Sequence, residues 1–111
     1  MIHAHLTDPI WKVALTIRLQ MVERYLAIME TTGTERSHYE TAYQTQDIDG
    51  WCRTRIEEML EKCETIAREN DPSMSVQSVV HDLFGNRLSM ALSGNAREKA
   101  AGFSKIDATL A

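Results

Sequence analysis

Three short stretches of this 111-residue sequence carry side chains whose types and spacing could support chemistry. In the first, Glu35 and His38 have the E-x-x-H spacing that places a carboxylate and an imidazole on one helix face, as in di-iron bundles. Such a site also needs glutamates that point inward from other helices, whereas Glu23 and Glu30 fall on the polar side of the expected first helix. We therefore interpret this stretch as solvated surface and keep a small carboxylate and histidine metal-binding bundle as an alternative function.

The second stretch, Asp47 to Gly50, has the spacing found in the middle of a calcium-binding EF-hand loop. With Gly50 at the position of the invariant glycine, Thr45 and Ile56 occupy the two end positions at which acidic ligands belong. The oxygen cage that Ca²⁺ requires is then incomplete. The sequence instead predicts that Asp47 or Asp49 caps a helix, and it predicts no metal and no cofactor.

The third candidate is the pair Cys52 and Cys63, which falls on one expected helix. Eleven residues of helix separate the two sulfur atoms by about 16 Å, so the two cysteines cannot form a disulfide with each other. Both lie on an apolar seam, where a free cysteine behaves as a small hydrophobic residue. No motif typical of a nucleotide site or a hydrolase appears either, and we expect a protein that is not an enzyme.

One segment near the C-terminus, LFGNRLSMALSGN, raises the possibility of DNA recognition. Its LSGN ending resembles the end of the recognition helix in LacI-type repressors, a resemblance that covers about six residues. In that motif the turn glycine precedes the final leucine by about ten residues, whereas Gly85 precedes Leu92 by only seven. The residues that should reach base edges are also mostly apolar here. The segment is better interpreted as a corner between two packed helices.

The elements that must position these residues are predicted to be helices. Two prolines and five glycines leave few helix breakers in the chain. We expect one all-α domain over residues 1–111, a small bundle of four to five helices that follows an extended N-terminal segment at residues 1–8. The expected helices are 9–30, 35–45, 50–70, 75–92 and 96–109.

Cap signals support these boundaries. Asp8-Pro9 and Ser75 are typical of helix starts, and Gly33 is expected to end the first helix in a left-handed conformation. Asn95 resembles the start of a capping box for the last helix. Whether Gly85 breaks the fourth helix is left open by the sequence.

The apolar patterns assign a role to the two longest helices. The third helix has the a/d spacing of a helix–helix seam, carried by Cys52, Ile56, Met59, Cys63 and Ile66. The first helix has two adjacent apolar stripes and is therefore expected to be central. One stripe comprises Ile10, Ala14, Ile17, Met21 and Ile28, and the other Trp11, Leu15, Val22, Tyr25 and Met29. Leu19 falls outside both stripes, among polar residues, and is expected to be exposed.

Composition and charge narrow the class of function. A net charge of −4 argues against a protein whose main task is to bind nucleic-acid phosphates. No signal peptide or bilayer-spanning stretch is apparent, so we expect a cytoplasmic protein that does not bind membranes.

The leading hypothesis is a protein–protein interaction module, a small regulator, inhibitor or adaptor that forms a homodimer. Its candidate partner-binding residues are the aromatic residues and the off-pattern leucine, namely Trp11, Leu19, Tyr39, Tyr43 and Trp51. The alternative is a nucleic-acid-binding transcriptional regulator that uses its C-terminal basic residues, namely Arg87, Arg97, Lys99 and Lys105.

Overall fold

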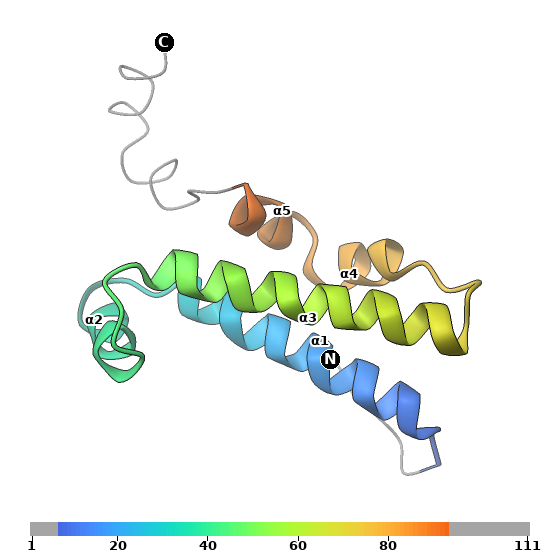
Figure 1. The fold of residues 1–111 in the computed structure, drawn as a ribbon. Helices are drawn as coiled ribbons and strands as arrows, with labels where there is room; N and C mark the ends of the chain where they lie inside the picture. Colours follow the sequence, from blue (N-terminus) through green and yellow to red (C-terminus); the bar gives the residue numbers. More distant parts are fainter. Residues whose placement is uncertain (1–6, 94–111) are drawn as a thin grey trace.

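The computed structural model of the chain describes residues 7–93, which form the all-α fold drawn in Figure 1. Across this range every regular element is a helix, which confirms the predicted class. The helices are α1 (Ile10–Met29), α2 (Gly33–Ala42), α3 (Ile48–Asn70), α4 (Val76–Phe84) and α5 (Asn86–Leu92). Within residues 7–93, none of them is both long enough and apolar enough to cross a membrane.

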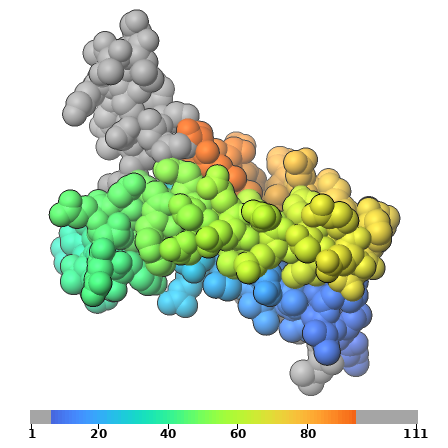
Figure 2. Space-filling view, viewed as in Figure 1, coloured from blue at the N-terminus to red at the C-terminus, as the bar shows by residue number. Residues whose placement is uncertain are grey.

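The two long helices, α1 and α3, lie side by side and antiparallel and form the centre of the fold (Figure 1). The short helix α2 lies at one end of this pair, where the chain turns from α1 to α3. Helices α4 and α5 follow one side of the pair, and α1, α3 and α5 contact one another. In Figure 2, α3 crosses the visible face as a ridge, with α5 and α4 above it and α1 below it.

The interior is built from the predicted seam of α3 and from one side of α1. Cys52, Ile56 and Cys63 are fully buried, and the other two seam residues, Met59 and Ile66, are half-buried against the same core. The core residues of α1 come mainly from the second predicted stripe and its neighbours: Leu15, Leu19, Val22, Leu26 and Met29. The predictions of a central first helix and of a helix–helix seam in the third are therefore confirmed.

Two parts of the prediction for α1 are wrong. Leu19 was expected to be exposed, yet it is 5% exposed and belongs to the core. Conversely, Ile10 and Ile17 of the first predicted stripe are 88% and 47% exposed, whereas Ile28 of the same stripe is buried in the core as expected. The reason is that the main neighbour of α1 is α3. The side of α1 that faces the core carries a seam with steps of four and three residues, namely Leu15, Leu19, Val22, Leu26 and Met29.

The start of α3 depends on a glycine as well as on its cap. The carboxylate of Asp47 accepts a hydrogen bond from the backbone N–H of Gly50 over 3.0 Å. A Cβ atom at Gly50 would collide with that carboxylate. The resemblance to a calcium loop is thus explained by helix capping, as predicted. Ser75 caps α4 in the same way, through the N–H of Ser78.

Two other cap predictions need correction. Pro9 was predicted to be the first residue of the helix. Helix α1 instead begins at Ile10, and Pro9 is its N-cap. Gly33 has the expected positive φ of 58°, but it begins α2, whereas α1 has already ended at Met29.

The predicted fourth helix, 75–92, is two helices separated by Gly85. This glycine has φ 56° and ψ −137°, a combination open essentially to glycine alone. Its N–H closes α4 on the carbonyl oxygen of His81, and α5 starts at the next residue. The segment that resembles a DNA-recognition motif is therefore a helix–helix corner. Asn95 and the predicted helix 96–109 lie outside the described residues.

Candidate interaction surface

The pair of helices α1 and α3 has one side covered by the C-terminal helices. On α3, Arg53 Nε donates a hydrogen bond to the carbonyl oxygen of Ala91 in α5 over 3.0 Å. Glu23 of α1 and Glu30, the residue that follows α1, bind Arg87 of α5. These contacts identify the flank of each long helix that faces α5.

The contact of Arg87 with α1 is a clamp of four hydrogen bonds. Its Nη1 and Nη2 donate to the two carboxylate oxygens of Glu23 over 3.1 and 2.8 Å. Its Nε and Nη2 donate to the two oxygens of Glu30 over 2.8 and 2.9 Å. The hydrogen bonds with Glu30 and then Glu23 raise the pKa of Arg87 further above its high ordinary value.

The position of Arg87 bears on the nucleic-acid alternative, in which it was a candidate phosphate or base contact. Its guanidinium is already bound to two carboxylates, whose charges would repel a phosphate. The other three candidates, Arg97, Lys99 and Lys105, lie outside the described residues. Nothing in residues 7–93 adds support to the alternative.

The opposite side of the same two helices is uncovered, and we call it the open face. Lys62 is nine residues from Arg53, which places it half a turn away on α3, and Met21 is on the opposite side of α1 from Glu23. The residues that form the open face are Ile10, Ala14, Ile17 and Met21 of α1 and Trp51, Arg55, Glu58 and Lys62 of α3. Each of these side chains is exposed or half-buried.

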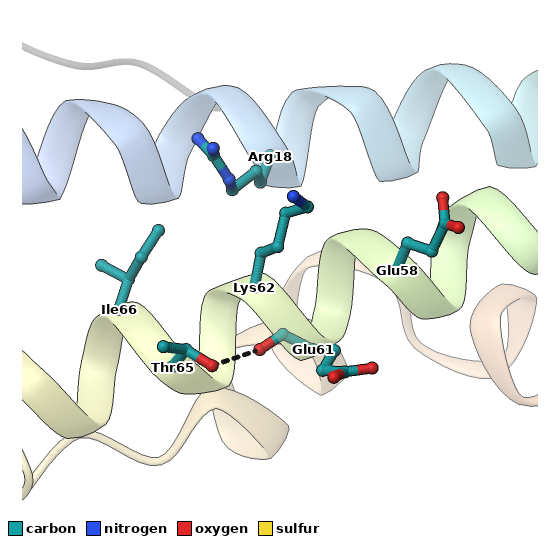
Figure 3. Close-up of a pocket in the computed structure, with 6 residues that line it drawn as sticks. All are labelled: Arg18, Glu58, Glu61, Lys62, Thr65 and Ile66. Carbon is teal, nitrogen blue, oxygen red and sulfur yellow. Dashed lines mark hydrogen bonds between the residues drawn. The ribbon is translucent and has the colours of Figure 1, made fainter.

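A groove between α1 and α3 runs along the open face. It has a volume of about 510 Å³ and is lined by Arg18 from α1 and by residues of α3, among them Glu58, Lys62 and Ile66. Figure 3 shows Glu58 and Lys62 extending from α3 toward α1, whereas Glu61 points away. The groove therefore presents both signs of charge beside the apolar stripe of α1.

Arg18 reaches this groove with most of its donors unused. Among the described residues, its guanidinium makes one hydrogen bond, from Nη1 to the carbonyl oxygen of Ala14 over 3.1 Å. Its Nε is buried and has no acceptor within residues 7–93. A guanidinium can donate five hydrogen bonds, so Arg18 retains capacity for a carboxylate from another molecule.

Three of the five predicted partner-binding residues come together at the α2 end of the molecule. Tyr43 stacks on Trp51, with ring centroids 4.3 Å apart, and Tyr39 stacks on Tyr43 at 6.2 Å. Tyr25 of α1 meets the edge of Trp51 at 5.8 Å, and the guanidinium of Arg55 lies 5.0 Å from the same ring. This aromatic cluster joins α2 to both long helices.

The cluster leaves little of Trp51 free. Tyr43 stacks on the indole, Arg55 lies over the ring and Tyr25 makes an edge contact with it. Trp51 is thus chiefly a packing residue, and its role with a partner stays a prediction. Trp11 also packs against the core and is half-buried, near the other end of α1, and Leu19 is too buried to reach a partner.

The residues considered for metal binding do not assemble. In residues 7–93 there is no group of three or more His, Cys, Asp or Glu side chains that could hold a metal ion. His38 and Glu35 are exposed on α2. Asp49 instead forms a largely buried ion pair with Arg36 of α2, 2.8 Å apart, which helps to hold α2 against α3.

Cys52 and Cys63 are free thiols without exposed surface. Burial raises the pKa of each to about 11, and the charge of Asp49 adds to the increase at Cys52. A thiol with this pKa is protonated at neutral pH and is a poor nucleophile. Both residues act as core side chains, as the seam pattern predicted.

Sequence reasoning missed the open face, because the stripe that forms its apolar part was assigned to the core. The charged residues that flank it, half-buried Arg18 and exposed Glu58 and Lys62, were not predicted to form such a surface. The comparisons add no assignment: no protein-family model, no curated protein and no solved structure matches the chain.

Proposed function

We propose that this protein is a non-enzymatic protein–protein interaction module, a small cytoplasmic regulator, inhibitor or adaptor, which pairs with a second copy of itself through the open face. The observation that carries the proposal is the uncovered apolar stripe of α1. Ile10 and Ile17 are 88% and 47% exposed on a helix whose opposite side is fully packed.

Physical chemistry favours covering this stripe. Removing apolar surface from water contributes roughly 25 cal/mol per Å², and the flanking charges of α3 give the stripe the polar rim typical of an interface. The covered side of the same helices already contains α4 and α5. A second molecule is therefore the natural partner for the side that remains.

Self-association is tested by analytical ultracentrifugation of the full chain from about 1 to about 300 µM, a range that covers weak dimers. We expect the apparent mass to rise from 12.6 kDa toward twice that value. The substitution Ile17→Lys should hold the protein at the monomer mass, because it places a charge in the middle of the stripe. Its far-UV circular dichroism should stay unchanged, since the side chain is exposed.

The matched control is Leu83→Lys. Leu83 is also an exposed apolar residue, 38% accessible, but it belongs to α4 and lies outside the open face. This variant should associate like the unmodified chain. A wild-type protein that remains a monomer throughout the range would overturn self-association as its function.

A further inference from the structure

The open face has a residue pattern that suits a dimer with twofold symmetry. When a helix packs on an antiparallel copy of itself across a twofold axis, residues equally far before and after the axis meet. On α1, Ile17 and Met21 lie two residues before and after Leu19. An axis at the height of Leu19 therefore places Ile17 of each copy against Met21 of the other.

The same rule gives opposite charges on α3. Glu58 and Lys62 lie two residues before and after Leu60, and both extend toward the groove (Figure 3). An axis at the height of Leu60 therefore places Glu58 of each copy opposite Lys62 of the other. It also brings Trp51 and Glu69 to the same height, nine residues on either side of Leu60.

These two centres lie at about the same height in the molecule. Arg18, next to Leu19 in α1, lines the same groove as Lys62, close to Leu60 in α3. A single twofold axis perpendicular to the two helices can therefore relate α1 to its copy and α3 to its copy. If the axis ran along the helices instead, the apolar stripe of α1 would pack against the charged side of α3 and would bury those charges unpaired.

We propose that a second copy docks on the open face with its helices antiparallel, α1 on α1 and α3 on α3, around a twofold axis near Leu19 and Leu60. This proposal rests on the self-association proposed above and adds its register. Glu58 of each copy enters the groove of the other between Lys62 and Arg18, where Arg18 has unused donors. The product is a four-helix centre with α4 and α5 on its two outer sides.

The size of the open face suits this occupant. Two parallel or antiparallel helices about 30 Å long and about 10 Å apart present a face of roughly 600 Å². Two such faces bury about 1,200 Å² in total, the lower limit for a stable specific interface. A concentration-dependent dimer is therefore expected.

Charge exchange between the two positions tests the register. Glu58→Lys alone and Lys62→Glu alone each place like charges opposite one another twice, so each should weaken the homodimer about tenfold or more. The double variant Glu58→Lys with Lys62→Glu restores both pairs, and its dissociation constant should return to within about threefold of the wild type. An equimolar mixture of the two single variants should form a heterodimer.

The control is Glu57→Lys, which makes the same charge change at an exposed position of α3 that does not line the groove. Glu57 lies one turn after Arg53 and is therefore on the side of α3 that faces α5, away from the open face. This variant should leave the dissociation constant unchanged. Circular dichroism of each variant checks that the fold persists, and Glu58 is suitable because its ion pair with Arg55 is exposed.

The outcomes separate this proposal from the proposed function. A dimer that Ile17→Lys disrupts, but that the charge variants do not weaken or that the double variant does not restore, would overturn the register and leave self-association standing. A wild-type monomer would overturn both. Recovery by the double variant and by the mixture would support the antiparallel arrangement.

Discussion

At the scale of single residues, the burial of two thiols makes the stability of the fold depend on pH. The pKa values of Cys52 and Cys63 are raised from their ordinary value of 9.0 to about 11 by burial. A raised pKa in the folded state stabilises the fold fully at pH values below 9, where both states keep the proton. That stabilisation is lost as the pH rises from 9 through 11, since the unfolded chain releases its protons first.

We therefore expect the free energy of unfolding to fall between about pH 8 and about pH 10.5, by up to about 2 kcal/mol for each thiol. Urea denaturation at the two pH values measures the decrease. The variant Cys52→Ala with Cys63→Ala starts from a lower stability because of the cavities it creates, but it should lose less on going to the higher pH. An equal decrease in both proteins would assign the effect to tyrosines and lysines.

Single residues also show where the apolar pattern of the sequence predicts burial correctly. The burial of the two cysteines followed from their positions on the a/d seam, because a seam fixes which side of a helix faces its neighbour. Leu19 was misplaced because it was grouped with its polar neighbours, although Leu15, Leu19, Val22, Leu26 and Met29 also follow one another in steps of four and three residues. The pattern that places Leu19 in the core was therefore present in the sequence of α1 itself.

At the scale of elements, Gly85 decides whether the segment from Val76 to Leu92 is one helix or two. Its φ of 56° and ψ of −137° are strained for any residue with a Cβ atom, although the space around it is open. We expect Gly85→Ala to lower the free energy of unfolding by about 1–2 kcal/mol through backbone strain alone. Urea denaturation followed by circular dichroism measures this loss.

The neighbouring substitution Asn86→Ala is the control, because Asn86 is exposed and has a helical backbone. Its effect should stay within about 0.5 kcal/mol. A similar loss in both variants, or a stable Gly85→Ala protein with one continuous helix, would contradict the assignment of the break to this backbone conformation.

The elements themselves were largely predictable. The caps at Asp47 and Ser75 and the apolar periods located the starts of α3 and α4, because these signals act within one or two turns. The choice between the two stripes of α1 was missed. Both stripes are apolar, and the packing of α1 against α3 decides which of them is covered.

At the scale of the whole molecule, the Arg87 clamp joins the first and last described helices. Its geometry needs the planar fork of arginine, which lysine cannot reproduce. We expect Arg87→Lys to lower the free energy of unfolding by about 1 kcal/mol, a modest value because all three side chains are more than a third exposed. Amide hydrogen exchange in α5 should accelerate, and urea denaturation gives the overall change.

Arg68→Lys provides the matched control, since Arg68 is exposed on α3, away from the clamp. It should leave both measurements unchanged. Protection of α5 that survives Arg87→Lys would show that apolar packing alone positions this helix.

The long sequence separation of the clamp sets a limit on what it can do. Arg87 is 57 and 64 residues from its two partners, and closing a loop of this length costs roughly 3–4 kcal/mol of chain entropy. Exposed ion pairs return less than that. The clamp cannot recruit α5 by itself, so Leu88 and Ala91, which are buried in the core, must supply the attraction. The clamp then fixes the rotation and register of α5 after hydrophobic packing has brought this helix into place.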